Sequence, residues 1–558
     1  MKLCRKFLLF YNTIKHLQSS QIAYRILFYL KKYIIFKFFK KIYYYYISTR
    51  NKLKTNEKFK FQYKEISLKN EYLNFEKNEF NFLNTKYSFG SKINWKDKPF
   101  FKNNTLWKFN LNYHNFLLEI INNRDLLKKD KVKIIQSVIS SWIEDNDFSQ
   151  IEFNPDNWNS YVVSNRIITW IKIYSTFEKD FDSDFKLHMI KSLKFHSNFL
   201  SKNFEYHLRG NHLLENAFAL LFSAYFFNNK NLYYQSSQVL TSELREQILI
   251  DGGHFELSPM YHQHILKRML DTIRLIQDNE IFDSSLIKLI ENKSSMMLSW
   301  LENLAFKNGD LPQVNDSSSR IYPSVNELKK YSEQLNLKKS NLKLSDSGYK
   351  KYVTNNYECL IDVGKIGPDY ILGHSHNDIF SFILYVHNEP FIIDRGISTY
   401  NQSQLRLEEK STSSHNTVMI AGNEQNEIWS NFRVARRTYP KIHNQKNNYI
   451  KASYKSIHTN ASHNREFYFN ENNLILRDHV NYECVNFSYL HFAPNIDPML
   501  NDNKLTTKLG TIILENVRNI VLEDYDYCDG FNKIKKAKKL KMEFIQESKI
   551  QINIINNL

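Results

Sequence analysis

The chain has 558 residues, a formal net charge of +18 and an aromatic content of 15%. A chain of this length predicts two or three domains and a large core. The charge is concentrated, because residues 1–60 carry 15 lysines and arginines against one acid, Glu57, whereas the rest carries 61 against 57. The body is nearly balanced and shows no known nucleic-acid-binding module, so we expect no nucleic-acid partner. Its modest basic bias still suits an anionic substrate.

Residues 1–60 form a basic, aromatic N-terminal arm. Between residues 26 and 49, dense aromatic and aliphatic side chains are interrupted by five lysines. A spanning helix needs about 20 apolar residues, and each central lysine costs roughly 2.5–3.5 kcal/mol, so we predict no transmembrane span. Residues 7–10 are too short for the apolar region of a signal peptide, and no cleavage site follows. Two interpretations stay open: peripheral membrane contact through residues 1–50, or a helical arm packed on the body.

The remaining chain divides by its hydrophobic pattern. Residues 61–105 are polar and irregular, which indicates a linker or a segment wrapped on the body. In residues 106–340, apolar side chains recur at helical spacing and predict an (α/α) toroid without a tight repeat. In residues 345–558, short runs rich in β-branched and aromatic residues predict an antiparallel β-sandwich. Helices are expected near 134–143, 167–173, 213–221, 231–247, 260–278 and 285–304, and strands at 359–363, 380–386, 390–393, 417–420, 449–454, 465–469, 474–476, 487–492 and 511–514. Residues 533–541 are basic and are expected to form a solvated strand edge or a helix.

Two polar clusters in the helical half are candidates for a functional site. Asn211 follows Gly210 at the start of a predicted helix, where it either caps the helix or binds a carboxylate with an amide that adds no titratable charge. Tyr261 would be an ordinary amphipathic tyrosine by itself. The glycine-rich turn at 251–256, which includes Glu256, leads into it and indicates a loop that positions a helix start at a site.

Three histidines and an aspartate fall within 42 residues of the β half. His376, Asp394 and His415 suit a divalent metal, with zinc favoured and calcium the alternative, and they leave His374 free for proton transfer. The competing interpretation is hydrogen bonding within a polar core. Asn377 and Asp378 are candidates for orienting the ligands. No organic cofactor is expected.

Arginines at 433, 436 and 437 follow further along the chain. A guanidinium binds carboxylate or sulfate as a planar fork, so we predict that Arg433 and Arg436 bind an acidic sugar. The competing interpretation is a solvated strand face, which is favoured for at least one of the three.

Together these motifs resemble the heparinase II/III family of polysaccharide lyases over roughly residues 100–500. The resemblance depends on the motifs at 210–216, 251–262, 373–382 and 414–417, each weak by itself, and on their order across a helical and then a β half. It implies a toroid followed by a β-sandwich, with a glycan cleft between them. It also implies β-elimination at a uronic acid, in which a base removes the C5 proton and the C4–O bond breaks.

The resemblance assigns roles to the matching positions. Asn211, perhaps with His212, would neutralise the substrate carboxylate, and Tyr261 and His374 would be base and acid. Glu256 is placed with the substrate-binding residues. His376, Asp394 and His415 would match the metal ligands found in part of the family.

Three functions stay open at this stage. The first is a lyase acting on a bacterial surface polysaccharide that contains uronic acid. The second is a uronosyl C5-epimerase, which uses the same proton abstraction without cleavage. The third is a non-catalytic glycan-binding or assembly protein at the membrane. The family implies the cell envelope, whereas the lack of a convincing signal peptide keeps the cytoplasmic face of the membrane as an alternative.

Overall fold

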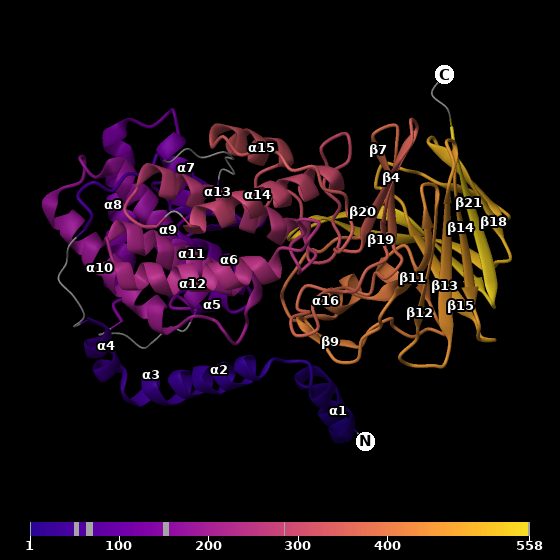
Figure 1. Cartoon of the computed structure of the whole chain (residues 1–558), viewed down its shortest axis with the longest axis horizontal. Helices are drawn as coiled ribbons and strands as arrows, with labels where there is room; N and C mark the ends of the chain where they lie inside the picture. The colour runs from indigo at the N-terminus through magenta and orange to yellow at the C-terminus, as the bar shows by residue number, and fades with distance from the viewer. Residues whose placement is uncertain (1, 49–54, 63–70, 149–155, 284, 556–558) are drawn as a thin grey trace.

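The computed structural model describes residues 2–48, 55–62, 71–148, 156–283 and 285–555. A helical region is followed along the chain by a region of antiparallel β-sheets, and the two lie side by side along the long axis of the molecule (Figure 1). This confirms the predicted fold class. The closure of the helices into a toroid stays a prediction.

The N-terminal arm is helical and lies along one edge of both regions (Figure 1). The helix α1 lies beneath the β region in this view, and α2 and α3 lie beneath the helical region. None of the described helices combines the length and the apolar character that crossing a bilayer requires. The arm consists of α1 (Lys2–Ile14), α2 (Ser19–Leu30), a π-helical turn (Lys31–Ile35), α3 (Phe36–Phe38) and α4 (Lys40–Ser48).

Residues 61–105, expected to be a linker or a segment wrapped on the body, contain a small antiparallel sheet. Its strands are β1 (Tyr72–Asn74), β2 (Glu79–Phe82) and β3 (Thr85–Ser88), followed by α5 (Lys98–Phe101). The ring of Phe82 lies 4.9 Å from that of Trp107, and the ring of Phe80 lies 5.0 Å from that of Phe116. Aromatic side chains therefore pack the sheet onto the first helices of the helical region, although the segment as a whole is polar.

The helical region surrounds one buried helix. Every residue of α11 except His212 is buried, which explains why the sequence is apolar on all sides of this helix. All six predicted helices are present, and four further helices, α6, α7, α10 and α15, were not predicted individually. The helices are α6 (Thr105–Tyr113), α7 (Phe116–Asn122), α8 (Lys128–Asp145), α9 (Ser160–Phe177), α10 (Ser183–Lys202), α11 (Gly210–Phe226), α12 (Lys230–Gln247), α13 (Pro259–Asp278), α14 (Ser285–Leu304) and α15 (Val325–Gln334).

The described β region contains one large sheet and three smaller ones, all antiparallel, and the smallest pairs β9 (Ile428–Ser430) with β10 (Arg433–Val434). The large sheet has the order β11 (Lys441–Lys446), β12 (Tyr449–Lys455), β13 (Ser462–Phe469), β14 (Asn473–Val480), β21 (Glu547–Ile554), β18 (Gly510–Glu515), β17 (Lys504–Thr506), β16 (Met499–Asn501). The second has the order β19 (Arg518–Gly530), β20 (Lys533–Phe544), β15 (Asn486–His491), β8 (Val418–Met419), and the third β4 (Tyr349–Val353), β5 (Tyr357–Asp362), β6 (Phe382–Val386), β7 (Glu389–Ile392). All nine predicted strands are present. The basic run 533–541 is a strand inside its sheet, where lysines pair with acids of β19.

The glycine-rich turn before α13 joins the two regions. Asp251 Oδ2 accepts hydrogen bonds from the backbone N–H of Ser345 at 2.9 Å and from the N–H and Oγ of Ser347 at 3.0 and 2.7 Å. At Gly252, φ is +89° and an added Cβ would lie 2.1 Å from the carbonyl oxygen of Met296. Only glycine fits this contact. The turn thereby fixes α13, which carries Tyr261, relative to the start of the β region.

Candidate active site

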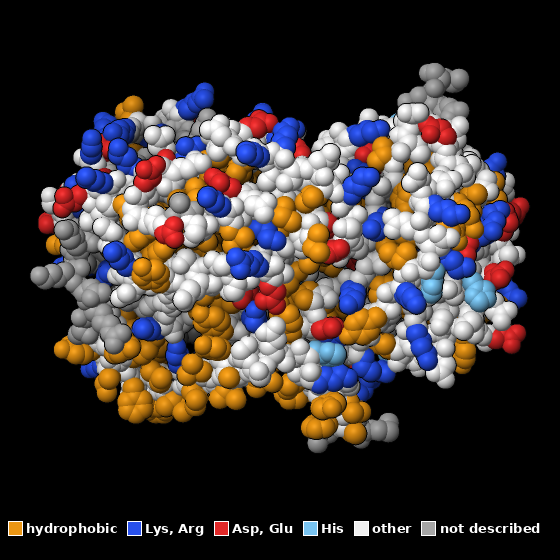
Figure 2. Space-filling view, in the orientation of Figure 1, with side chains coloured by type: hydrophobic (Ala, Val, Ile, Leu, Met, Phe, Trp, Pro, Cys, Tyr) orange, Lys and Arg blue, Asp and Glu red, His pale blue; other side chains and the backbone are white. Residues whose placement is uncertain are grey.

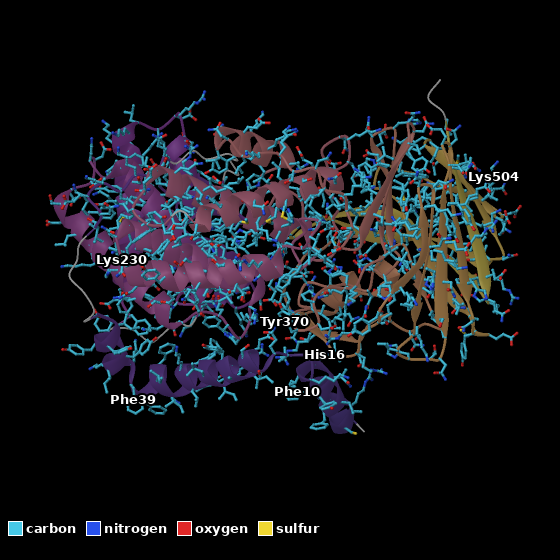
Figure 3. The ribbon with its side chains drawn as sticks, in the orientation of Figure 1. Phe10, His16, Phe39, Lys230, Tyr370 and Lys504 are labelled. Carbon is cyan, nitrogen blue, oxygen red and sulfur yellow. The ribbon has the colours of Figure 1, made fainter. Side chains whose placement is uncertain are left out.

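A cavity of about 1050 Å³ opens where the two regions and the arm meet. Its walls come from segments that are far apart in the sequence. Tyr370 of the body faces the junction of α1 and α2, where His16 also lies (Figure 3). The predicted residues that line the cavity are Asn211, His212, Glu256, Tyr261, His374 and Arg433.

Asn211 is held at the start of α11 by Glu256. Glu256 Oε1 accepts the backbone N–H of Asn211 at 2.9 Å, and Oε2 accepts its side-chain N–H at 2.8 Å. Asn211 is therefore not a helix cap; the cap position is Arg209. Glu256 therefore positions Asn211, and it also lines the cavity, so that its predicted contact with substrate stays a prediction. The close contact between Glu256 and the start of α11 requires a glycine at 210, where φ is +55° and an added Cβ would lie 2.1 Å from Glu256 Oε1.

Tyr261 lies in the first turn of α13 and meets His374 from the β region. Their ring centroids are 4.0 Å apart, and the Tyr261 hydroxyl lies 3.1 Å from that of Tyr400. Burial, followed by the neighbouring Tyr400, raises the pKa of Tyr261 well above its ordinary value. The hydroxyl therefore keeps its proton at neutral pH and can donate it.

His374 is oriented by Asp316, a residue the sequence analysis did not select. Its Nδ1 lies 2.9 Å from Asp316 Oδ2, and its Nε2 lies 3.5 Å from Glu256 Oε2. Burial by itself would raise the pKa of Asp316, but Arg406 and its other partners hold it well below its usual range. An ionised carboxylate only accepts hydrogen bonds, so the proton of neutral His374 lies on Nδ1 and leaves a lone pair on Nε2.

His212 is the one side chain of α11 that reaches the cavity without being buried. Its Nδ1 lies 3.3 Å from Glu205 Oε1, and its ring centroid lies 4.6 Å from that of Tyr161. Burial by itself would lower the pKa of His212, but Glu205 raises it above the ordinary value. The imidazole therefore keeps a positive charge to a higher pH than a free histidine does.

A second buried network of hydrogen bonds and ion pairs lies beneath the cavity, and no sequence pattern predicted it. Arg268 donates to Glu215 from Nη2 at 2.6 Å, and His264 Nε2 lies 3.2 Å from both Glu215 Oε2 and the Tyr161 hydroxyl. Burial by itself would raise the pKa of Glu215, but Arg268 and His264 lower it to about 2. Tyr161, His264 and Arg268 all line the cavity. Glu215 belongs to the motif 210–216 and lies four residues after Asn211, so both side chains project from the same face of α11. This spacing could have indicated that Glu215 lies near the site.

The two predicted substrate-binding arginines differ in position. Arg433 lines the cavity, with its guanidinium 5.2 Å from the centre of the Trp429 ring. Arg436 is not among the cavity-lining residues; its Nε lies 3.1 Å from Glu427 Oε2, and its Nη1 donates to the carbonyl of Ile457. The prediction for Arg436 is therefore corrected, because an intramolecular ion pair already uses its fork. Arg437 lines the cavity but is engaged by Asp369.

The predicted metal ligands lie close together in the β region. His415 Nδ1 lies 2.7 Å from Asp394 Oδ2, the rings of His376 and His415 are 5.3 Å apart, and His376 Nε2 lies 2.9 Å from Asp316 Oδ1. Within the described residues, no three His, Cys, Asp or Glu side chains already form a metal site. However, the second nitrogen of each imidazole, His376 Nδ1 and His415 Nε2, and Asp378 Oδ2 are buried without a hydrogen-bond partner.

The donor chemistry of this cluster fits a divalent metal. Each imidazole gives its other nitrogen to a carboxylate, which fixes a tautomer with a free lone pair when the ring is neutral. Burial is the main cause that raises the pKa of Asp378 to about 6. Asp394 is already engaged by His415 and by the N–H of Gly396. Two nitrogen lone pairs and a carboxylate without a partner are therefore buried together.

The chain belongs to the heparinase II/III family. The family model of the heparinase II/III N-terminus matches residues 13–341, and that of the heparinase II/III-like C-terminal region matches residues 337–553. The boundary between the two models falls between α15 and β4, where the structure changes from helices to strands.

Individual relatives are more distant. The chain is 26% identical over 343 residues to a heparin-sulfate lyase of Bacteroides thetaiotaomicron, a match that covers 52% of this chain and 48% of the relative. It is 22% identical over 368 residues to a heparin-sulfate lyase of Pedobacter heparinus, covering 60% and 54%. The chain thus spans about half the length of the curated relatives it matches.

Solved structures share the fold. A crystal structure of heparinase III aligns with a TM-score of 0.70 at 17% identity, over 93% of this chain and 90% of that one. A mutant heparan sulfate lyase from Pedobacter heparinus aligns with a TM-score of 0.57 at 18% identity, over 85% and 80%.

The contact between Gly210 and Glu256 makes a prediction about stability. We expect Gly210→Ala to lower the free energy of unfolding by about 2–4 kcal/mol, because the new Cβ combines a left-handed backbone with overpacking against the carboxylate. Urea denaturation measures the change. Gly309→Ala is the matched control, because φ is +90° there and nothing lies within 4 Å of the added Cβ. Equal losses in the two variants would mean that the contact with Glu256 does not matter.

Proposed function

We propose that the cavity catalyses β-elimination on a polysaccharide that contains uronic acid. The observation that carries the proposal is the meeting of Tyr261 and His374, 4.0 Å apart, beside an amide and an imidazole that can receive a carboxylate. The match to lyase family models over nearly the whole chain supports the same reaction class.

In this reaction, the two roles are the reverse of those that the family resemblance implies: His374 takes the C5 proton and Tyr261 gives a proton to the leaving O4. His374 is suited to the first step because Asp316 holds its Nδ1 and leaves the Nε2 lone pair free. Tyr261 is suited to the second because burial keeps its hydroxyl protonated. The electron pair of the C5–H bond forms the C4–C5 double bond as the C4–O bond breaks, and the leaving sugar receives the tyrosine proton.

Asn211 and His212 neutralise the substrate carboxylate as charge develops. The carbanion at C5 delocalises into this carboxylate, so donors fixed in advance stabilise the transition state more than the ground state. Glu256 fixes the Asn211 amide, and Glu205 keeps His212 positively charged.

An epimerase remains the second candidate, because it uses the same proton abstraction. The protonated Tyr261 beside His374 supports it equally, as a donor that can return a proton to C5 from another direction. Incorporation of solvent deuterium at C5 without chain shortening would select the epimerase. A purely binding protein is disfavoured, because binding requires no oriented proton acceptor and donor together.

The catalytic proposal predicts the effect of two substitutions. Incubation with a panel of uronate polymers, including the host's own surface glycan, should give a product that absorbs in the near ultraviolet through its C=C–COO⁻ group. We expect Asn211→Ala to lower kcat by about 100-fold or more, and Tyr261→Phe to lower it by about 100- to 10,000-fold.

The matched control is Tyr439→Phe, an exposed tyrosine outside the cavity. It should retain full activity. No ultraviolet absorbance and no deuterium at C5 across the panel would refute the proposed chemistry. Full activity of Tyr261→Phe would refute the assigned role of Tyr261.

We propose further that the cluster of His376, Asp394 and His415 holds a structural divalent metal, with Asp378 as an added ligand. The buried lone pairs without partners support this. Zinc is favoured over calcium because two of the donors are imidazole nitrogens. Such an ion would fix the loop that carries His374, and no proton transfer passes through it.

Metal analysis of the purified protein tests the cluster. We expect about one zinc per chain by elemental mass spectrometry, lost in His415→Ala. Removal by a chelator should lower the melting temperature, because an ion bound only by the folded state stabilises it. Stoichiometric metal that persists in His415→Ala, or a melting temperature unaffected by the chelator, would contradict the assignment.

We propose that the arm binds an anionic membrane surface. Its outer face exposes large apolar side chains, including Phe38 at 67%, Phe39 at 51% and Ile42 at 67% exposure, and Lys37 and Lys41 are exposed among them. Figure 2 shows hydrophobic side chains gathered along the edge where α2 and α3 lie. The helical part of the arm, residues 2–48, carries no acidic residue, which complements anionic lipid headgroups.

Vesicle co-sedimentation measures this binding. We expect binding to phosphatidylcholine vesicles that contain phosphatidylglycerol, weaker binding to pure phosphatidylcholine, and a loss at high salt. The triple variant Phe38→Ser, Phe39→Ser, Ile42→Ser should lose at least about tenfold in affinity. Met499→Ser, exposed at 67% in the β region, is the control and should bind normally. Binding unchanged by the triple variant would exclude this surface.

A further inference from the structure

The arm is also a wall of the catalytic cavity. Residues of α1 and α2 line the same cavity as His212, Tyr261 and His374. Hydrogen bonds connect both α1 and α2 to the body. Gln21 Nε2 of α2 donates to the carbonyl of Tyr370 at 3.3 Å, and Trp429 Nε1 donates to Thr13 Oγ1 of α1 at 3.0 Å. Whatever occupies the site therefore also contacts the arm.

This wall is mostly apolar, unlike the catalytic wall. Ile22, Ile26 and Tyr29 line the cavity from α2, and Ile14 and Leu17 line it from α1 and the turn that follows. A uronate polymer carries hydroxyl and carboxylate groups along its whole length, and burying them against such a wall without hydrogen-bond partners is costly. The wall instead fits a hydrocarbon chain.

A pair of arginines without carboxylate partners stands beside the apolar wall. Arg25 and Arg433 both line the cavity, and within the described residues neither forms an ion pair. The other cavity-lining cations are each engaged by an acid: Arg209 by Glu243, Lys267 by Asp271, Arg268 by Glu215 and Arg437 by Asp369.

The two guanidiniums come from different parts of the chain and line the same cavity. Arg25 donates to the carbonyl of His207 at 3.1 Å, and burial is the main cause that lowers its pKa. Arg25 lies three and four residues from Ile22 and Tyr29, so the charge and the apolar side chains share one face of α2. Two guanidiniums that line one cavity without an acid favour an anion with several oxygens, such as a phosphate group.

We propose that the arm side of the cavity binds the lipid-phosphate end of a membrane-borne glycan, with the phosphate at Arg25 and Arg433 and the hydrocarbon against α1 and α2. The sugar units would then extend toward Tyr261 and His374. The assignment of the sugar part rests on the proposed function, whereas the lipid-phosphate site stands on its own residues. The exposed outer face of the arm places this wall next to the bilayer from which such a substrate would come.

Calorimetric titration of the full chain with farnesyl phosphate tests the site without any uronic acid. We expect farnesyl phosphate to bind at least about tenfold tighter than inorganic phosphate, which lacks the hydrocarbon, and than dodecyl maltoside, which lacks the charge. Dihexanoyl phosphatidylglycerol represents the bilayer's own headgroups and should also bind at least about tenfold more weakly. Equal affinities for farnesyl phosphate and any one of these probes would overturn the proposal.

Two variants locate the binding. Arg25→Gln and Arg433→Gln should each weaken farnesyl phosphate binding by about tenfold or more, because each removes a charged hydrogen-bond donor. Arg436→Gln is the matched control, since this neighbouring arginine lies outside the cavity, and it should bind normally. Unchanged affinity in both cavity variants would also overturn the proposal. Since no probe contains uronic acid, these results do not depend on whether the lyase reaction is found.

Discussion

The active site depends on one buried carboxylate, that of Asp316. Its side chain receives His374 Nδ1 and His376 Nε2, each at 2.9 Å, and Arg406 Nη2 at 2.5 Å, and its backbone carbonyl accepts the hydroxyl of Ser258 at 2.8 Å. Ser258 precedes the helix that carries Tyr261. One residue thus fixes the proposed proton acceptor, the proposed proton donor and the cluster proposed to hold a metal relative to one another. A buried charge of this kind is tolerated only when it is fully paired, so loss of any partner would disturb the others.

The wall proposed to be catalytic follows one physical pattern, in which each group proposed to contact substrate is oriented by a buried acid behind it. Glu256 holds Asn211, Glu205 stands behind His212, and Asp316 stands behind His374. The acids are satisfied by these contacts and do not present free charge to a uronate. This explains how a cavity rich in carboxylates can accept an acidic sugar. It also explains why the overall charge of the body is a poor guide to the substrate.

The arm connects the two activities proposed for this chain, membrane binding and catalysis in the cavity. Its outer face carries exposed aromatic side chains and lysines, and its inner face closes the catalytic cavity. A segment whose outer face contacts a membrane and whose inner face lines the cavity would bring a lipid-borne glycan within reach of the reacting groups. This arrangement differs from a cleft open to solvent along its whole length, which suits free polymers.

The sequence by itself determined the fold class, the six predicted helices, the nine predicted strands and the motifs that contain Asn211, Tyr261 and His374. Hydrophobic periodicity reports local structure directly, and these motifs contain residue types that chemistry requires. It did not reveal Asp316, because a lone aspartate in an irregular segment has no periodic signal. It misplaced Arg436, because the pairing of its guanidinium with Glu427 is decided by the folded structure and not by a local sequence pattern.

Only the tertiary structure decided which side chains meet. Tyr261 and His374 are more than 100 positions apart, and their contact depends on how the turn at Asp251 joins the two regions. The aromatic sheet at residues 72–88 and the arm's place in the cavity wall likewise follow from long-range packing. Pattern and composition fix what each segment can become, whereas burial and pairing between distant segments decide what the site contains.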